Sequence, residues 1–170
     1  DSVIQNVTFS NNYLESNNTK NLNLGGGAVF MDLHQFSKNL TLDNISCFNN
    51  SIFANTHSIV HGGSLYIIGD DLVPGFSVKN SFFDSNFILL QENFLAYGGA
   101  LSIDCPTEIS IDNCTFSSNY VDTSYIGSGG AVAIRNARTT IRTCTFQNNF
   151  ITSSGEYGYC YGGAIFSDSN

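Results

Sequence analysis

The fold is decided by two segments, GGAVAI at residues 129–134 and TTIRTCTFQNN at residues 139–149, which a short polar break separates. The Gly-Gly pair, followed by a small and then an aliphatic residue, recurs along the chain and begins at Gly26, Gly62, Gly98, Gly129 and Gly162. Its spacings are 36, 36, 31 and 33 residues. A fixed motif at such a period is the signature of a repeat architecture.

The second segment carries its own repeated motif, Phe-x-x-Asn, with one Cys in the Phe position. Its copies run from Phe9, Cys47, Phe83, Phe116 and Phe146 to Asn12, Asn50, Asn86, Asn119 and Asn149. Apolar residues alternate with polar ones in both segments, as expected for short strands. The same apolar positions recur in every repeat; the column after Gly-Gly, for example, contains Val29, Leu65, Leu101, Val132 and Ile165.

Period-two alternation within a repeat, and identity between repeats, indicate stacked coils with like residues one above another at about 4.8 Å. The predicted fold is an all-β, right-handed, single-stranded parallel β-helix with about five coils of 31–36 residues. Each coil is expected to have three short strands and a loop of variable length. A β-sandwich or an up-and-down barrel predicts hairpin turns and no such identity between strands.

The corners of the coil are expected at the Gly-Gly pairs and at two Asn columns. Glycine permits a sharp corner, and Asn tolerates the left-handed region and hydrogen-bonds neighbouring backbone. Stacked Asn side chains should also pair along the axis. The two columns contain Asn6, Asn44, Asn80 and Asn113, and Asn12, Asn50, Asn86, Asn119 and Asn149.

Residues 1–170 are interpreted as one β-helix segment without a second domain. The chain starts within a coil and stops at residues 162–166 before the next coil is complete. Solenoids need polar caps over their end coils, and neither end has one. We therefore expect a fragment of a longer solenoid that is open at both ends, where unpaired strand edges permit end-to-end stacking between copies.

Charge excludes several classes of partner. The chain has 14 acidic and six basic residues and a formal net charge of -8. So few cations cannot supply the phosphate contacts of a nucleic-acid-binding protein, and an acidic surface is repelled by anionic lipids. No apolar run approaches the length of a spanning helix, so we expect no membrane insertion in this segment.

Sequons for N-glycosylation are dense. Asn-x-Ser/Thr, with x not proline, occurs at Asn6, Asn17, Asn39, Asn44, Asn49 and Asn113. Three of these, Asn6, Asn44 and Asn113, share one corner column from which a glycan could project. The competing interpretation is that these are unmodified turn residues. We expect at least two sequons to carry glycans.

The five cysteines lack the paired spacing of a structural zinc site. Cys114 and Cys144 occupy equivalent inward positions in adjacent coils, where a stack of buried thiols is expected rather than a disulfide. Cys105 and Cys160 lie at coil edges and are the better disulfide candidates. The odd count leaves at least one thiol unpaired within the chain.

No catalytic, cofactor-binding or metal-binding set is apparent in the sequence. Asp70-Asp71 could contribute to a calcium site, but calcium takes six to eight oxygen ligands, and a solvated turn is the simpler interpretation. The outward row before Phe-x-x-Asn lacks a carboxylate pair on adjacent coils; it contains Gln5, Asp43, Lys79, Asp112 and Arg142. Each Gly-Gly leads into a strand and not a helix, which argues against nucleotide binding.

The Gly-Gly-Ala-aliphatic and Phe-x-x-Asn motifs resemble the repeats of the chlamydial polymorphic outer membrane proteins (Pmp), autotransporter adhesins with a β-helical passenger. Similar repeats occur in large surface proteins of protists and, more broadly, in pectin-lyase-like β-helices. The resemblance covers nearly the whole chain and implies a β-helix displayed at a cell surface. The dense sequons favour a eukaryotic surface protein over a bacterial one.

The leading functional hypothesis is a non-enzymatic structural or adhesion module, extracellular or at the cell surface: a glycosylated rod that presents binding loops or polymerises end to end or laterally. The alternative is a carbohydrate-active β-helix, lyase or hydrolase, with its site mostly outside this segment. A partner, such as a bound glycan, is expected on the variable loops, roughly residues 13–25, 51–61, 87–97, 120–128 and 150–161. Their aromatic residues are Tyr13, Phe53, Phe87, Phe94, Tyr97, Tyr120, Tyr125, Tyr157, Tyr159 and Tyr161.

Overall fold

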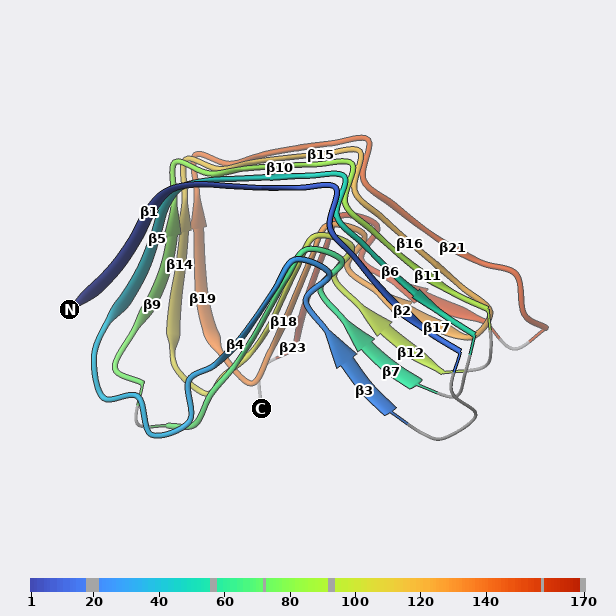
Figure 1. Cartoon of the computed structure of the whole chain (residues 1–170), viewed down its shortest axis with the longest axis horizontal. Coiled ribbons are helices and arrows are strands. Elements are labelled where there is room, and N and C mark those ends of the chain that lie inside the picture. Colours follow the sequence, from blue (N-terminus) through green and yellow to red (C-terminus); the bar gives the residue numbers. More distant parts are fainter. Residues whose placement is uncertain (18–21, 56–57, 72, 92–93, 157, 169–170) are drawn as a thin grey trace.

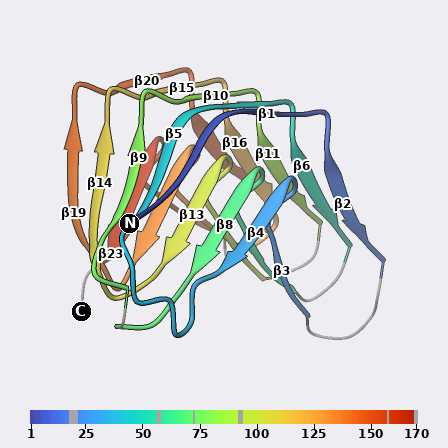
Figure 2. The same ribbon diagram turned by 60° about the vertical axis from the view of Figure 1, so that its left-hand side comes forward.

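The computed structural model describes residues 1–17, 22–55, 58–71, 73–91, 94–156 and 158–168. The described residues contain strands and no helix, and the chain winds into a solenoid of about five turns (Figures 1 and 2). Every strand pair is parallel, and each strand pairs with the equivalent strand of the next turn. The predicted parallel β-solenoid is confirmed.

Four sheets, which we label A to D, run along the solenoid. Counted from the Gly-Gly pair, each turn of the chain passes through sheet D, then A, then B and then C. Sheet A has a first set of strands, β1 (Ser2–Ser10), β5 (Leu40–Phe48), β9 (Phe76–Lys79), β14 (Glu108–Asp112) and β19 (Arg138–Arg142). β1 and β5 bend around the first Asn corner. In later turns a second set continues the sheet beyond that corner, with β10 (Phe82–Asp84), β15 (Thr115–Ser117) and β20 (Thr145–Gln147).

The other three sheets have five strands each. Sheet B contains β2 (Tyr13–Ser16), β6 (Ser51–Ala54), β11 (Phe87–Leu90), β16 (Tyr120–Thr123) and β21 (Phe150–Ser153). Sheet C contains β3 (Leu22–Gly25), β7 (Ser58–His61), β12 (Leu95–Tyr97), β17 (Ile126–Ser128) and β22 (Tyr159–Tyr161). Sheet D contains β4 (Val29–Asp32), β8 (Leu65–Ile68), β13 (Leu101–Asp104), β18 (Val132–Arg135) and β23 (Ile165–Asp168).

Sheets B and C differ from the expectation of loops. The segments predicted as variable loops contribute two strands per turn, and the short stretches between those strands contain residues 18–21, 56–57, 92–93 and 157, which lie outside the described part. The strands form because their apolar residues also alternate: Ile52, Ile88 and Val121 point inward from sheet B and are fully buried. The segments that differ in length between repeats are the connections from sheet B to sheet C and from sheet D to sheet A.

The core is divided into two parts, which Figure 1 shows as two lobes of the coil. The larger cluster fills the space between sheets A and D and includes Leu42, Ile67, Ile103 and Phe116. The smaller one lies between sheets B and C around Ile52 and its neighbours. Equivalent residues stack throughout; ring centroids in the Phe column are 4.7 Å apart for Phe83–Phe116 and 4.9 Å for Phe116–Phe146.

The Gly-Gly corner and the second Asn column meet at the waist between the lobes. The first glycine of each pair has a positive φ; that of Gly62 is 59°. At the second glycine, a Cβ on Gly63 would lie 2.0 Å from the carbonyl oxygen of Gly99 and 2.6 Å from that of Phe87. Both positions therefore require glycine, one for its backbone angle and the other because backbones touch there.

The second Asn column forms a buried hydrogen-bonded ladder. The side-chain oxygen of Asn86 accepts from the backbone N–H and the Nδ2 of Asn50, at 3.1 and 3.0 Å. Its own Nδ2 donates to Asn119 Oδ1 and to the carbonyl of Cys47, both at 3.0 Å. The same pattern runs from Asn12 to Asn149, with Asn50, Asn86 and Asn119 fully buried. The predicted Asn ladder is confirmed.

The left-handed corner residues are placed slightly differently from the prediction. Asn6, Asn44, Asn80 and Asn113 in the first Asn column have positive φ, as predicted. At the second corner the left-handed residue precedes the buried Asn; these residues are Asn11, Asn49, Ser85, Ser118 and Asn148. The buried Asn is thus selected for its hydrogen bonds, and the residue before it makes the turn.

Candidate functional site

The six sequon asparagines all lie on the solvent-exposed surface. In the first Asn column, Asn44 Nδ2 donates to Asn6 Oδ1 and Asn113 Nδ2 donates to Asn80 Oδ1, each at 2.8 Å. Asn49 donates to Asn11, Asn39 to Asp1, and Asn17 to Glu15. Each side chain is therefore accessible at an edge or corner, and the first Asn column forms one line along the solenoid, as the sequence predicts.

The five cysteines all lie within the described residues, and each is a free thiol in the structure. Cys114 and Cys144 are stacked, with the Cys114 backbone N–H 3.4 Å from Cys144 Sγ. Cys105 is buried in the turn after β13, whereas Cys160 is exposed on β22. Burial raises the pKa of Cys47 and Cys114 to about 12 and that of Cys105 to about 11, so these thiols are protonated near neutral pH.

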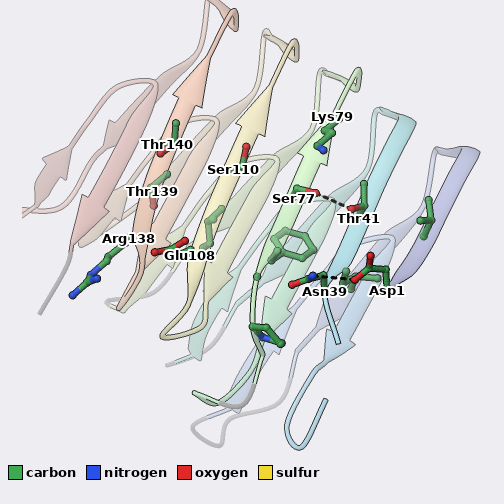
Figure 3. A pocket seen from close by; sticks show the side chains of 16 residues that line it. Asp1, Asn39, Thr41, Ser77, Lys79, Glu108, Ser110, Arg138, Thr139 and Thr140 are labelled. Atoms are coloured by element: carbon green, nitrogen blue, oxygen red, sulfur yellow. Dashed lines mark hydrogen bonds between the residues drawn. The ribbon is translucent and has the colours of Figure 1, made fainter. Parts of the chain in front are cut away.

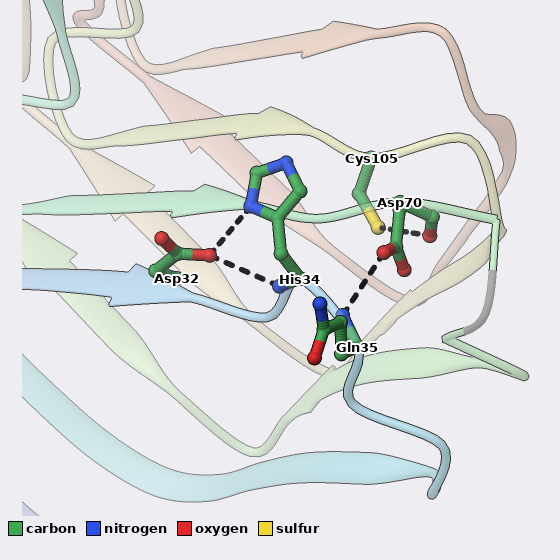
Figure 4. A network of polar contacts seen from close by, with 5 residues as sticks. All are labelled: Asp32, His34, Gln35, Asp70 and Cys105. Carbon is green, nitrogen blue, oxygen red and sulfur yellow. Dashed lines mark hydrogen bonds and ion pairs between the residues drawn. The ribbon is translucent and has the colours of Figure 1, made fainter.

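Asp70 belongs to a small polar network at the end of sheet D (Figure 4). Its carboxylate accepts the backbone N–H of Gln35 at 2.9 Å, and its carbonyl lies 3.7 Å from Cys105 Sγ. Nearby, Asp32 accepts from the backbone N–H of His34 at 3.0 Å, and this bond, then the His34 ring, lowers the Asp32 pKa. No group of three or more His, Cys, Asp or Glu residues suited to a metal ion occurs within the described ranges.

The outward row predicted on sheet A is present, and its members pair in register along the sheet: Gln5, Asp43, Lys79, Asp112 and Arg142. Beside it lies a shallow groove of about 630 Å³, shown in Figure 3. Hydroxyl, charged and apolar side chains line the groove, and Thr41 and Ser77 are hydrogen-bonded to each other there at 2.9 Å. The charged groups around it alternate in sign, because Glu108 pairs in register with Arg138 and Asp112 with Lys79.

Sheets C and D diverge from the Gly-Gly corner on the outside of the solenoid (Figure 1). Two separate pockets lie there, one lined by Gly25, Phe30 and Tyr66 among others, and one by Tyr97, Ser128 and Tyr161 among others. One column of residues on this surface stands directly before the Gly-Gly pairs, and contains Gly25, His61, Tyr97, Ser128 and Tyr161. The facing column of sheet D contains Phe30, Tyr66, Ser102, Ala133 and Phe166. We call this surface the C/D groove.

Aromatic rings are stacked along the C/D groove. His61 lies between Tyr66, at a centroid distance of 4.3 Å, and Tyr97, at 5.1 Å. The guanidinium carbon of Arg135 lies 4.9 Å from the centre of the Tyr97 ring. Arg135 also approaches Asp104 at 3.4 Å. The stack therefore continues from rings into a planar cation, an arrangement that favours a cation–π contact.

Burial and the nearby cation determine the charge state of this stack. Burial, and then the positive charge of Arg135, lower the pKa of His61 to about 3, so its imidazole is neutral near pH 7. Burial, and then Asp104, raise the pKa of Tyr66 to about 12; burial also raises the pKa of Tyr97. The rings are thus uncharged and serve as packing surfaces.

Sequence reasoning placed Tyr97 and Tyr161 on a rim of loops, but both lie on strands of sheet C and face sheet D. Tyr157 lies outside the described residues. His61 was not singled out in the sequence, although it stands directly before a Gly-Gly pair, the position that faces sheet D. An aromatic or large residue directly before Gly-Gly, in three of five repeats, was the available signal.

The class that this fold defines is the parallel β-solenoid. In comparisons with known proteins, no family model matches the chain, and no curated protein and no solved structure is significantly similar to it. No helical segment with the length and apolarity needed to cross a bilayer occurs in the described part of the chain.

Proposed function

We propose that this chain is a non-enzymatic structural and adhesion module of an extracellular or cell-surface protein. It acts as a rigid β-helical rod whose outer faces carry glycans and contact partners. The observation that carries the proposal is the Asn12–Asn149 ladder, buried at its three central residues, which links every turn to the next through side-chain and backbone hydrogen bonds. Such continuous coupling favours a stiff spacer over a molecule with moving parts.

The surface features support an extracellular setting. Six exposed sequons are dense for 170 residues, and a polar, acidic composition with few basic residues suits a secreted glycoprotein. The resemblance of the two repeat motifs to the Pmp adhesins and to protist surface proteins points in the same direction. Lateral or end-to-end contact between copies fits the repeated outer faces and would extend the rod.

The chemistry of the described side chains supports a non-enzymatic role. His61 is neutral and held between two tyrosine rings, so it is unsuited to accepting a proton near neutral pH. Three of the five thiols are protonated because burial raises their pKa. The charged row on sheet A alternates between acids and bases and offers no adjacent pair of carboxylates for acid–base hydrolysis.

An antibody raised against the folded chain tests the proposal. It should label intact, unpermeabilised cells of the source organism, and brief protease treatment of those cells should remove the signal. The purified chain should release no product from neutral or acidic polysaccharides. Labelling that requires permeabilisation contradicts the surface location, and sustained turnover contradicts the non-enzymatic role.

A further inference from the structure

The outer face of sheet A has a charge balance that differs from that of the whole chain. The chain has 14 acidic and six basic residues. On this face, which Figure 3 shows, three of those bases stand close to four acids: Lys79, Arg138 and Arg142, with Asp1, Asp43, Glu108 and Asp112. Copies with a net charge of -8 repel one another, but this face is close to neutral.

One row of this face alternates regularly in sign. From β5 to β19 it contains, in register, Asp43, Lys79, Asp112 and Arg142. The charges along the row are therefore negative, positive, negative and positive. In the opposite direction they are positive, negative, positive and negative. The row is thus complementary to a reversed copy of itself.

A twofold axis can bring this row against its own reverse. The axis runs parallel to the strands, between β9 and β14, and two copies then meet face to face with their solenoid axes antiparallel. Asp43 lies opposite Arg142 of the second copy, and Lys79 lies opposite Asp112 of the second copy. Because a twofold contact is isologous, each of these ion pairs occurs twice.

The two neighbouring rows are compatible with this arrangement. The next row offers only hydroxyls to its own reverse, which leaves room for bridging water; it contains Thr41, Ser77, Ser110 and Thr140. In the row beyond it, Arg138 faces Asn39 of the second copy and Glu108 faces Gly75, so no like charges meet. Asn39 is also a sequon, and a glycan there would cover this face; pairing therefore requires Asn39 to be unmodified.

Other alignments of the same face bring like charges together. If the twofold axis lies on β9 or on β14, Lys79 or Asp112 faces itself. In a parallel pair with its turns in register and centred on the hydroxyl row, Asp112 faces Glu108 and Arg142 faces Arg138. Juxtaposed like charges oppose association. Charge therefore favours the antiparallel pair centred between β9 and β14.

The size of the face sets the strength of the contact. Four strands about 4.8 Å apart and five residues at about 3.3 Å each give roughly 300 Å² per copy. This is less than half of the area that each partner contributes to a standard interface. A single pair is therefore weak, and modules held at a surface would adhere through many such contacts.

We propose that the outer face of sheet A pairs with the same face of a second copy in the antiparallel orientation, so that modules on facing surfaces adhere to each other. This inference rests on the proposed adhesion function and names its partner. The two fail separately, because a chain that does not pair leaves the surface-labelling result intact.

The test is sedimentation equilibrium of the chain produced in bacteria without glycans, at concentrations up to about 1 mM. Salt at about 0.15 M screens the net charges beyond about 8 Å and leaves contacting pairs largely intact. We expect the average mass to rise with concentration from 18.4 kDa towards twice that value. The expected dissociation constant is on the order of 0.1 mM, because the face is small.

Charge reversal provides a test in trans. Lys79→Asp or Asp112→Lys alone places like charges opposite each other and should weaken association at least tenfold. An equimolar mixture of the two variants should restore association, because each pair again joins opposite charges. Glu15→Lys is the control: it makes the same change in net charge as Asp112→Lys, but on sheet B, and should leave the dissociation constant within about twofold.

If either variant does not fold, Asp43→Arg and Arg142→Asp provide the same test at the other ion pair. Four results overturn the proposal. The mass may stay at 18.4 kDa at the highest concentration, or rise well beyond a dimer, which indicates open stacking. A mixture of folded variants that associates no better than its components contradicts the antiparallel pairing. Equal weakening by Glu15→Lys shows that net charge alone controls association.

Discussion

The buried asparagines show how a single residue type couples neighbouring turns. Each one uses its oxygen for the previous turn and its amide for the next turn's Asn and the previous turn's carbonyl. No other side chain of this size both accepts and donates in that geometry: Asp lacks the donor, and Leu lacks both functions. The ladder therefore specifies the register of the stack as well as contributing to its stability.

Replacing Asn86 by Ala tests the ladder. The variant removes the acceptor of the Asn50 backbone N–H and one acceptor of Asn50 Nδ2, which still reaches the Phe9 carbonyl, and it takes a donor from the Cys47 carbonyl, all in a buried position. We expect a loss of about 3–5 kcal/mol in the free energy of unfolding, measured by urea denaturation. Asn55→Ala is the control, because Asn55 is exposed and its Nδ2 donates to the exposed Asn17; it should change stability by less than about 0.5 kcal/mol. Equal effects would refute a special role for the buried column.

His61 gives the protein a pH dependence of defined sign. Its folded pKa of about 3 lies below the usual value of 6.5, so the folded state binds fewer protons between these values. The contribution of neutral His61 to the free energy of unfolding is therefore fully present above about pH 6.5 and is lost as the pH falls towards 3. His61→Phe keeps a ring between Tyr66 and Tyr97 but cannot titrate. The variant should therefore lose less stability than the parent between pH 6.5 and 4; an unchanged slope in thermal melts would contradict the assignment.

The exposure of the cysteines predicts how fast each thiol reacts with a reagent in solution. Cys160 is exposed, whereas Cys47, Cys105 and Cys114 are buried and have raised pKa values. An aromatic disulfide reagent should titrate Cys160 rapidly at pH 8, and Cys160→Ser should remove the fast phase while Cys47→Ser leaves it. Absence of a fast phase in the non-reduced protein, with its return on reduction, would support the disulfide predicted for Cys160.

Among the structural elements, the Gly-Gly corner can be tested with one substitution at two equivalent positions. A Cβ at Gly63 meets carbonyl oxygens of the next turn and of sheet B, whereas a Cβ at Gly163 meets nothing within 4 Å. Gly63→Ala should destabilise the fold by more than about 4 kcal/mol or prevent folding, and Gly163→Ala should lie within about 0.5 kcal/mol of the parent. Far-UV circular dichroism during urea unfolding measures both. Similar behaviour of the two variants would show that backbone contact at the waist is not the constraint.

Element by element, the sequence predicts most where repeats are most alike. The strands of sheets A and D were identified because their apolar columns recur at fixed offsets, as in Val29 to Ile165 and Phe9 to Phe146. Sheets B and C were missed because the stretch between the Asn of Phe-x-x-Asn and the next Gly-Gly differs in length between repeats and was interpreted as one loop. The strands of sheet B nevertheless start directly after that Asn, and those of sheet C end directly before Gly-Gly. Large residues before Gly-Gly mark the lining of the C/D groove in the sequence, but its shape depends on the angle at which two sheets leave the Gly-Gly corner, which the sequence pattern does not indicate.

At the scale of the whole molecule, the repeated ladders make every turn depend on its neighbours. Apolar, aromatic and Asn columns all run along the same axis, and the outer faces repeat with them. This arrangement suits a rod that displays side chains at regular intervals, which is the role proposed for it. The sequons Asn6, Asn44 and Asn113 share one such outer line; Asn6 and Asn44 are on adjacent turns, so glycans on both would crowd each other.

The proposal of a glycosylated surface rod is tested most directly by mapping N-glycans on the protein isolated from its natural source. Enzymatic deglycosylation in H₂¹⁸O converts each occupied Asn into ¹⁸O-labelled Asp, which peptide mass spectrometry locates. We predict labelling at two or more of Asn6, Asn17, Asn39, Asn44, Asn49 and Asn113, with Asn113 occupied independently of the crowded pair. Six unlabelled sequons would contradict the glycosylated rod and, with it, the strongest support for an extracellular location.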